Sequence, residues 1–327
     1  MQAGRRSLLT ALALASTAPW LARARAAEPS ATTSTAIEVE AGVYMMQGAP
    51  GEASAANLGR VGNAGFIVGR AGVIAVDTGT SFQHGEALLQ AIAQVTDKPV
   101  RLALVTHARQ EFLFGAAAFQ ARGIPVQMHR RAAQLMASRC DGCLKALQRE
   151  LGEEAMRGTT VFRPDEVFDD SHAMDMIGRP VLVQYHGHSS GPGDIAVFDL
   201  RTGTLFGGGL IDHRRIPDVQ DSDLEGWKRA LAGLRTLKLS TVVPGHGTMT
   251  TPDVIDSVER YLLRLEARVA ALLRQGAPLS EVPDAADLPE YRQWDQYDTI
   301  HRRNASIVFL RLERALMFGE PPTGAPR

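Results

Sequence analysis

A short apolar run, Val100-Arg-Leu-Ala-Leu-Val105, passes directly into the polar segment Thr106-His107-Ala-Arg109-Gln-Glu111-Phe112. An apolar run of this length between turn residues predicts a buried strand. Two runs upstream, Gly65 to Val68 and Val73 to Val76, are separated by a glycine-containing turn and predict a hairpin. Helical sequence follows from Phe112 to Arg122, so strands and helices alternate through this half of the chain.

The second half of the chain repeats this order. Val181 to Tyr185, Ile195 to Leu200 and Thr204 to Phe206 are β-rich runs. An apolar stripe from Ile255 to Leu272 predicts a long helix, and a last helix is expected over Tyr297 to Met317. Strand-rich and helical stretches thus occur twice, which indicates an α/β (α+β) fold built as a four-layer αββα sandwich, with two sheets between helices.

The composition is that of a globular protein. The chain has 327 residues, of which 45% are hydrophobic, 22% charged and 6% aromatic, and this excludes disordered, collagen-like and multi-span membrane classes. The formal net charge of -1 lacks the basic surplus of a nucleic-acid binder, so no nucleic-acid partner is expected.

The first 26 residues have the pattern of an export signal. Arg5 and Arg6 precede an apolar stretch to Leu21, and Ala24-Arg-Ala26 is a small-x-small cleavage site. The paired arginines and the modest hydrophobicity favour a twin-arginine signal over an ordinary secretory signal. The apolar stretch is shorter than the roughly 20 residues of a membrane span. We therefore expect a periplasmic protein without a membrane anchor in its mature form, which starts near Ala27 and is mildly acidic.

Three of the histidines lie just after a predicted strand. His107, His188 and His246 each occupy a turn-rich segment at such a strand end. Side chains at strand ends meet at one edge of a sheet, where α/β folds build metal and catalytic sites. A single histidine in such a position is more often structural, but three of them favour a common site.

The segments around these histidines resemble, in order, those of the metallo-β-lactamase-fold superfamily. They are Val76-Asp77-Thr-Gly, Thr106-His107, Gly187-His188-Ser-Ser-Gly and Val243-Pro-Gly-His246-Gly. The resemblance covers the mature chain and implies a single domain of this fold over 27–327, with C-terminal helices. Cys140-Asp-Gly-Cys-Leu, Arg215-Ile-Pro with Trp227 downstream, and Arg303-Asn304 resemble more narrowly the periplasmic quinoprotein relay system zinc metallohydrolases.

The metal ligands that this resemblance implies are only partly present. The superfamily pattern His-x-His-x-Asp-His binds two zinc ions, and here His107 is followed by Arg109, Glu111 and Phe112 at the ligand positions, while Gly209 stands where a bridging aspartate is expected. Phenylalanine has no lone pair, and the arginine guanidinium stays protonated. Because each catalytic zinc needs about three protein ligands, a normal dizinc centre is not expected.

Two arrangements remain open for this site. In the first, His107, His188, His246 and Glu111 bind one zinc ion, weakly or singly, and Arg109 turns toward solvent. In the second, Arg109 pairs with Glu111, its charge replaces the missing cation, and the pocket binds an anion without hydrolysing it. Zinc is the only cofactor that either arrangement could need.

Further polar side chains are candidates for the same pocket. His186 could carry a proton or act as a reserve ligand, and Glu111 could also manage protons. Asp212 and His213 follow the Gly209 segment, although Asp212 is not the equivalent of the missing aspartate. The resemblance implies that Asp77 orients the loops, while a simple turn-forming role is the alternative.

Cys140 and Cys143 are the only cysteines of the chain and are expected to interrupt the helical stretch from Arg130 to Leu151. In an oxidising compartment, a structural disulfide is the favoured interpretation. A zinc ribbon would need a second pair, and thioredoxin-like chemistry lacks the usual preceding strand.

The sequence leaves two functions open. One is a hydrolase of an ester, thioester or amide that uses at most one metal ion, with a small-molecule substrate. The other is a non-catalytic binding or accessory protein of a quinoprotein dehydrogenase pathway. They differ in their dependence on metal.

Overall fold

The structure is a computed structural model, and it describes residues 35–319. The expected signal over residues 1–26 and its cleavage site lie outside the described residues. No helix among residues 35–319 is long and apolar enough to cross a membrane.

The first sheet has seven strands in the order β1-β2-β3-β4-β5-β6-β7. Neighbours from β1 to β4 are antiparallel, and those from β4 to β7 are parallel. The strands are β1 (Ile37–Glu40), β2 (Val43–Met46), β3 (Ala64–Val68), β4 (Val73–Val76), β5 (Val100–Val105), β6 (Val126–His129) and β7 (Glu166–Phe168).

The second sheet has five strands in the order β12-β11-β10-β9-β8. Only β11 and β12 are parallel, and the other neighbours are antiparallel. The strands are β8 (His172–Met174), β9 (Val181–Tyr185), β10 (Ile195–Asp199), β11 (Thr204–Phe206) and β12 (Thr241–Val243).

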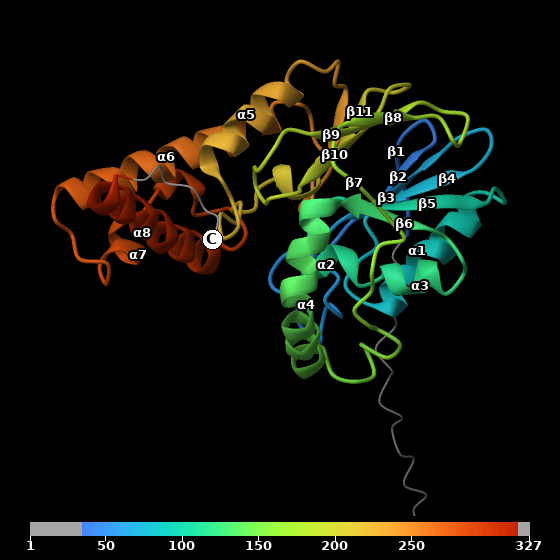
Figure 1. Cartoon of the computed structure of the whole chain (residues 1–327), viewed down its shortest axis with the longest axis horizontal. Helices are drawn as coiled ribbons and strands as arrows, with labels where there is room; N and C mark the ends of the chain where they lie inside the picture. The colour runs from blue at the N-terminus through green and yellow to red at the C-terminus, as the bar shows by residue number, and fades with distance from the viewer. Residues whose placement is uncertain (1–34, 320–327) are drawn as a thin grey trace, which may run out of the picture. The chain divides into compact units, whose positions relative to one another are not determined.

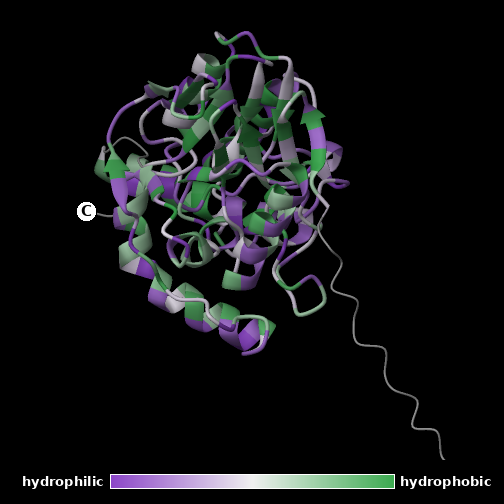
Figure 2. Cartoon of the chain, turned by 90° about the vertical axis from the view of Figure 1, so that its right-hand side faces the viewer, coloured by the Kyte–Doolittle hydropathy of each residue, from purple (hydrophilic) through white to green (hydrophobic). Residues whose placement is uncertain are grey.

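Three buried clusters define the layers of the sandwich. Leu102 and Leu104 of β5 belong to the cluster between the two sheets, whereas Ala103 and Val105 pack under helices on the outer face. This alternation follows from the two-residue period of a strand, and cover on both faces explains why the whole run is apolar. Hydrophobic residues accordingly gather in the strands of the sandwich, whereas the outer helices carry both kinds of residue (Figure 2). The αββα arrangement is confirmed.

Helices cover the outer faces of both sheets (Figure 1). The first sheet is covered by helices α1 (Phe82–Val95), α3 (Ala116–Gln120) and α4 (Arg130–Leu151), with the short α2 (Gln110–Leu113) between strand β5 and α3. Beside the second sheet, α5 (Leu224–Leu234), α6 (Val254–Arg274) and α8 (Arg302–Phe318) share one buried cluster with residues of β10 to β12. Helices α6, α8 and the short α7 (Val282–Ala285) pack on one another and extend away from the strands (Figure 1). A π-helical turn, Tyr297–His301, leads into α8.

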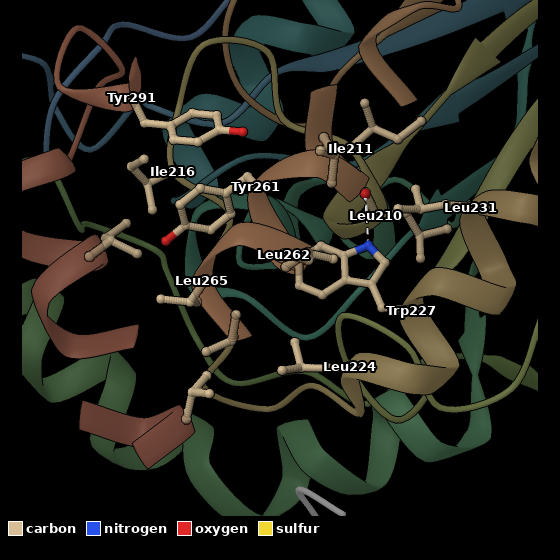
Figure 3. Close-up of a cluster of buried hydrophobic side chains, with 14 of the residues drawn as sticks. Leu210, Ile211, Ile216, Leu224, Trp227, Leu231, Tyr261, Leu262, Leu265 and Tyr291 are labelled. Atoms are coloured by element: carbon tan, nitrogen blue, oxygen red, sulfur yellow. Dashed lines mark hydrogen bonds between the residues drawn. The ribbon is translucent and has the colours of Figure 1, made fainter. Parts of the chain in front are cut away.

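The C-terminal helices share one core with α5. Trp227 is fully buried there, and its indole N–H donates to the carbonyl of Leu210 at 3.0 Å. Tyr261, Leu262 and Leu265 of α6 lie around the same indole (Figure 3). The apolar stripe predicted from Ile255 to Leu272 is therefore the face by which α6 packs on α5 and α8.

Two expected boundaries differ from the structure. The helical sequence after His107 forms two short helices, α2 and α3, because the chain turns at Phe114 and Gly115, where the Gly115 Cα lies too close to the Thr78 carbonyl for any side chain. The Cys140–Cys143 segment does not interrupt α4, which runs unbroken through it. One glycine inside a long helix costs only about 1 kcal/mol, and this is too little to break it.

Candidate functional site

Strand ends bring two of the three predicted histidines, His107 and His246, into one site. Asp77 follows β4, His107 follows β5 and His246 follows β12. All three side chains are buried. Asp77 has a φ of 59°, a left-handed conformation that aspartate tolerates better than most residues. The chain thus accepts an unfavourable backbone to aim this carboxyl group at the next strand end.

Asp77 and His107 are joined through Thr106. The Thr106 amide donates to Asp77 Oδ1 at 2.8 Å, and the Thr106 hydroxyl donates to the same carboxyl at 2.9 Å. When Asp77 is ionised, the single hydroxyl proton goes to its carboxylate, so the His107 Nδ1–H is the donor in the 2.7 Å contact with Thr106 Oγ1. His107 Nε2 is then a bare lone pair, buried and without a hydrogen-bond partner.

Burial decides the protonation of this pair. Burial raises the pKa of Asp77 to about 7, although the hydrogen bonds from Thr106 oppose the shift. Burial, with the charge of Arg109, lowers the pKa of His107 well below its ordinary value. His107 is therefore a neutral imidazole at neutral pH.

A second cluster joins Asp212, His246 and Glu111. His246 Nδ1 lies 2.8 Å from Asp212 Oδ1, and its Nε2 lies 3.4 Å from Glu111 Oε1 without the alignment of a hydrogen bond. Burial opposes charge on both groups, yet His246 and Arg109 lower the pKa of Glu111 to about 2. Asp212 and Glu111 in turn raise the pKa of His246, again against the effect of burial. The imidazole thus sits between two carboxylates that favour its charged form.

The ring of Phe112 contacts both histidines. Its centroid lies 4.2 Å from that of His107 and 5.1 Å from that of His246. The tip of the ring rests against Gly62, where a Cβ atom would lie 2.7 Å from Phe112 Cζ. Phe112 is fully buried. An apolar ring therefore occupies the space beside two imidazoles.

Gly209 also lies at the site. A Cβ atom at Gly209 would be 2.7 Å from Asp194 Oδ2 and 2.9 Å from His107 Cδ2. Asp194 is buried and accepts a hydrogen bond from the Ser190 hydroxyl at 2.7 Å, and burial raises its pKa to about 6. A carboxylate from another segment thus stands next to the position where the sequence lacks one.

Arg109 does not pair with Glu111 as the second arrangement required. Its Nη2 donates to the Asp218 carbonyl at 2.8 Å, and its Nη1 lies 3.6 Å from Asp218 Oδ2. Arg303 on α8 holds the same carboxylate at 2.7 Å. Asn304 fixes this segment from α8, because its side chain accepts from the Val219 amide and donates to the Pro217 carbonyl. The Arg109 guanidinium thus binds the 217–219 segment, and the Arg109 side chain is only 22% exposed.

The remaining predicted site residues point elsewhere. His188 Nε2 is 2.6 Å from the carbonyl of Asp221, so this nitrogen is the donor of that hydrogen bond. The ring of His186 packs against Gly233 of α5. His213 Nδ1 is 2.9 Å from the Thr248 carbonyl. Neither His186 nor His213 joins the cluster around His107 and His246.

The donors present do not fit a zinc centre. His107 Nε2 and His246 Nε2 are buried and lack hydrogen-bond partners, as ligand atoms would. However, Phe112 packs on both rings and the Nε2 of His188 is already used. Within residues 35–319, no group of three or more His, Cys, Asp or Glu side chains is placed to hold a metal ion. The four-ligand arrangement of His107, His188, His246 and Glu111 is therefore not assembled.

The two cysteines lie one turn apart on α4 and are both free thiols, so the expected disulfide is not formed in this structure. Cys140 is buried and Cys143 is partly buried. The segment carries no second pair of ligands.

Comparison with known proteins agrees with this geometry. The sequence profile of the metallo-beta-lactamase superfamily matches residues 58–246, more than half of the chain. The chain belongs to the metallo-beta-lactamase superfamily. No curated protein matches its sequence. The matched residues end at His246, so helices α6 to α8 lie beyond them.

Solved structures of the superfamily share the fold at low identity. A metallo-beta-lactamase from Pontibacter korlensis is 21% identical with a TM-score of 0.58, and the match covers 70% of this chain and 98% of that protein. One from Erythrobacter litoralis is 18% identical, with a TM-score of 0.57 and coverage of 70% and 95%. FIM-1 from Pseudomonas aeruginosa, solved in its mono-zinc form, is 21% identical, with a TM-score of 0.55 and the same coverage.

Sequence reasoning missed three residues of the site. Thr106 links Asp77 to His107, Asp194 lies beside Gly209, and Asp218 holds Arg109. Asp194 directly precedes the apolar strand β10, and an acid at the end of a buried strand was a usable signal. Nothing in the local sequence marks Asp218, because its partner lies 109 residues away.

Proposed function

We propose that this protein is a non-hydrolytic member of the metallo-beta-lactamase superfamily that serves as an accessory protein of a quinoprotein dehydrogenase pathway. The contact of Phe112 with both His107 and His246 carries the first part of the proposal. A buried apolar ring offers no ligand and shields the two imidazoles from a hydrated ion.

The charges of the site support the same conclusion. Glu111 and Asp212 lie against His246, and Asp218 lies against Arg109. Each charged group thus has an internal partner, and a dication would have to compete with His246 for both carboxylates. Arg109, which lies near Glu111, would add repulsion at close range.

The cellular role rests on the sequence. Arg5, Arg6 and the cleavage pattern at Ala24 to Ala26 support export to the periplasm by a twin-arginine-type signal. The narrower resemblance in the cysteine segment, in Arg215-Ile-Pro and in Arg303-Asn304 supports the link to a quinoprotein system. Asn304 forms hydrogen bonds with Pro217 and Val219, on either side of the Asp218 carbonyl that accepts from Arg109. The narrower resemblance therefore includes a residue that positions the partner of Arg109.

A single-metal hydrolase is the second candidate. The observation that favours it is the pair of buried, unpartnered nitrogens, His107 Nε2 and His246 Nε2. Buried polar atoms usually find partners, and these two lie where the superfamily binds metal.

Metal analysis separates the two candidates. The full chain is expressed in a bacterial host, recovered from the periplasmic fraction and analysed for zinc before and after incubation with zinc or chelator. We expect well under one zinc per chain and an unchanged melting temperature under both treatments. Stoichiometric zinc with chelator-sensitive esterase turnover would establish the hydrolase instead, and recovery of uncleaved protein from the cytoplasm would contradict export.

Variants that rebuild the ligands provide a matched control. Arg109→His with Phe112→His restores two ligand positions, and Gly209→Asp restores a third. Because a Cβ atom at Gly209 would meet Asp194, the last change needs Asp194→Ser as well. Zinc affinity should rise only in the combined variant. If it stays flat there, the assigned ligand positions are wrong.

A further inference from the structure

Cys140 and Cys143 form a pair of thiols that the proposed function does not use. They are the only cysteines of the chain, and they lie three positions apart on α4, so their side chains are neighbours on one face of the helix. Cys140 is 1% exposed, whereas Cys143 is only partly buried. Cys143 is therefore the more accessible of the two residues.

Gly142 lies between the two thiols without a packing reason. A Cβ atom at this position would meet no other atom within 4 Å, so an alanine would fit. Glycine in a helix interior costs about 0.5–1 kcal/mol relative to alanine. What glycine supplies here is backbone freedom in the turn that joins the sulfurs.

That freedom matches the movement that a disulfide would need. Residues three apart on a helix have Cβ atoms about 5–6 Å apart, whereas a disulfide holds them at roughly 3.5–4.5 Å. The turn must therefore tighten by about 1–2 Å for a bond to form. A bond closed in this way is strained, and strained disulfides are readily reduced.

Neighbouring charges distinguish the two sulfurs. The neighbouring Cys140 thiol lowers the pKa of Cys143 with help from Arg139, against the opposing effect of burial and a smaller effect of Glu111. The neighbouring Cys143 and burial raise the pKa of Cys140. Arg139 is itself held by Asp221 at 2.5 Å, so its position beside the pair is fixed. Cys143 is the sulfur with more thiolate character, and thiolate is the nucleophile in exchange.

We propose that Cys143 and Cys140 form a redox-active dithiol that exchanges with a disulfide of a small molecule or a peptide, with the partner disulfide in excess so that the strained protein disulfide forms. The Cys143 thiolate attacks one sulfur of the partner disulfide, forms a mixed disulfide and releases the first partner thiolate, which takes up a proton. Cys140 then loses its proton and attacks the Cys143 sulfur, which releases the second partner thiol. The two thiols of the protein are oxidised to a disulfide, and the partner disulfide is reduced to two thiols.

Reaction of the full chain with oxidised glutathione tests the proposal by mass spectrometry. The wild type should lose two hydrogens without keeping glutathione, and dithiothreitol should reverse the change. Cys140→Ser should accumulate one glutathione on Cys143. Cys143→Ser should react at least tenfold more slowly, because its remaining thiol is buried. Circular dichroism checks that each variant keeps its helices.

The contrary results are distinct. A wild type that stays fully reduced, or that ends with glutathione on Cys143, would overturn the proposal, and neither result needs a variant. Gly142→Ala serves as the matched control for the backbone. It should slow ring closure several-fold and leave the glutathione adduct of the Cys140→Ser background unchanged. Equal closure rates would overturn the role of Gly142. None of these outcomes depends on zinc.

Discussion

Asp77 shows how one residue couples the site to pH. Asp77 is 4% exposed, and burial is the largest cause of its pKa of about 7. The charge of Asp194 also raises this pKa, and the charge of His246 lowers it. Between pH 4 and 7 the folded state holds a proton that the unfolded state has released. The contribution of protonated Asp77 to the free energy of unfolding is therefore fully present below pH 4, and it is lost as the pH rises through 7.

The variant Asp77→Asn should remove this dependence, because asparagine resembles the protonated acid and accepts a positive φ. The difference in free energy of unfolding between the variant and the wild type should therefore shift in favour of the variant from pH 4 to pH 8. The shift should be a few kcal/mol, on the order expected for a pKa change of about three units. Urea denaturation at both pH values measures the difference, with the exposed Asp97→Asn as the charge control. Parallel profiles would show that Asp77 does not titrate as described.

The contacts of single residues in the site differ in how far the sequence predicts them. His107, His246, Glu111, Phe112 and Gly209 come together because the two sheets pack face to face and the ends of β5, β11 and β12 meet at one end of the sandwich. The partner of Arg109 depends instead on how the 217–219 segment is held by α8, and no local pattern encodes that contact. The hydrogen bond from His188 to the Asp221 carbonyl likewise has no signal in the local sequence.

At the scale of elements, the packing of α5 depends on two glycines, seven residues apart. A Cβ atom at Gly226 would lie 1.8 Å from the His188 carbonyl oxygen, which is backbone, whereas one at Gly233 would lie 2.6 Å from the His186 ring, which can rotate. Gly226→Ala should therefore cost about 2–4 kcal/mol through displacement of the helix.

Gly233→Ala is the matched control. Its clash should be largely offset by the gain in helix propensity of roughly 1 kcal/mol. Urea denaturation of both variants compares the two costs. Similar losses of stability at both sites would mean that the close approach of α5 to the His188 carbonyl does not position this helix.

The sequence predicted strands well where both faces of the strand are buried. The runs Val73 to Val76 and Val100 to Val105 are strands with the expected bounds, since both faces of the sheet are covered. Prediction failed at α4, where Gly142 suggested a break. Helix propensity is a weak local term there, and packing of Ala132, Met136 and Leu147 against the first sheet outweighs it.

At the scale of the whole molecule, helices α6 and α8 are joined to the sandwich by a shared core. Phe309 of α8 is 2% exposed within the cluster that contains Trp227, whereas Leu316 of the same helix is 74% exposed. Phe309→Ala should cost about 3–5 kcal/mol, and Leu316→Ala should have little effect.

The same core predicts a single unfolding transition for residues 35–319. Trp227 and Trp294 report this cluster by fluorescence, since Trp20 lies in the expected signal, and circular dichroism reports all elements. The two transitions should coincide in urea. An earlier fluorescence transition would mean that the C-terminal helices unfold on their own.

The clamp formed by Arg109, Asp218 and Arg303 has a consequence for the history of the protein. Changing Arg109 alone would leave Asp218 with one cation instead of two, and adding a carboxylate at Gly209 alone would collide with Asp194. Each of these single substitutions toward the zinc ligands of the superfamily meets a cost before it gives any benefit. Natural selection, which proceeds by single substitutions, would find a path to a zinc site blocked by epistasis.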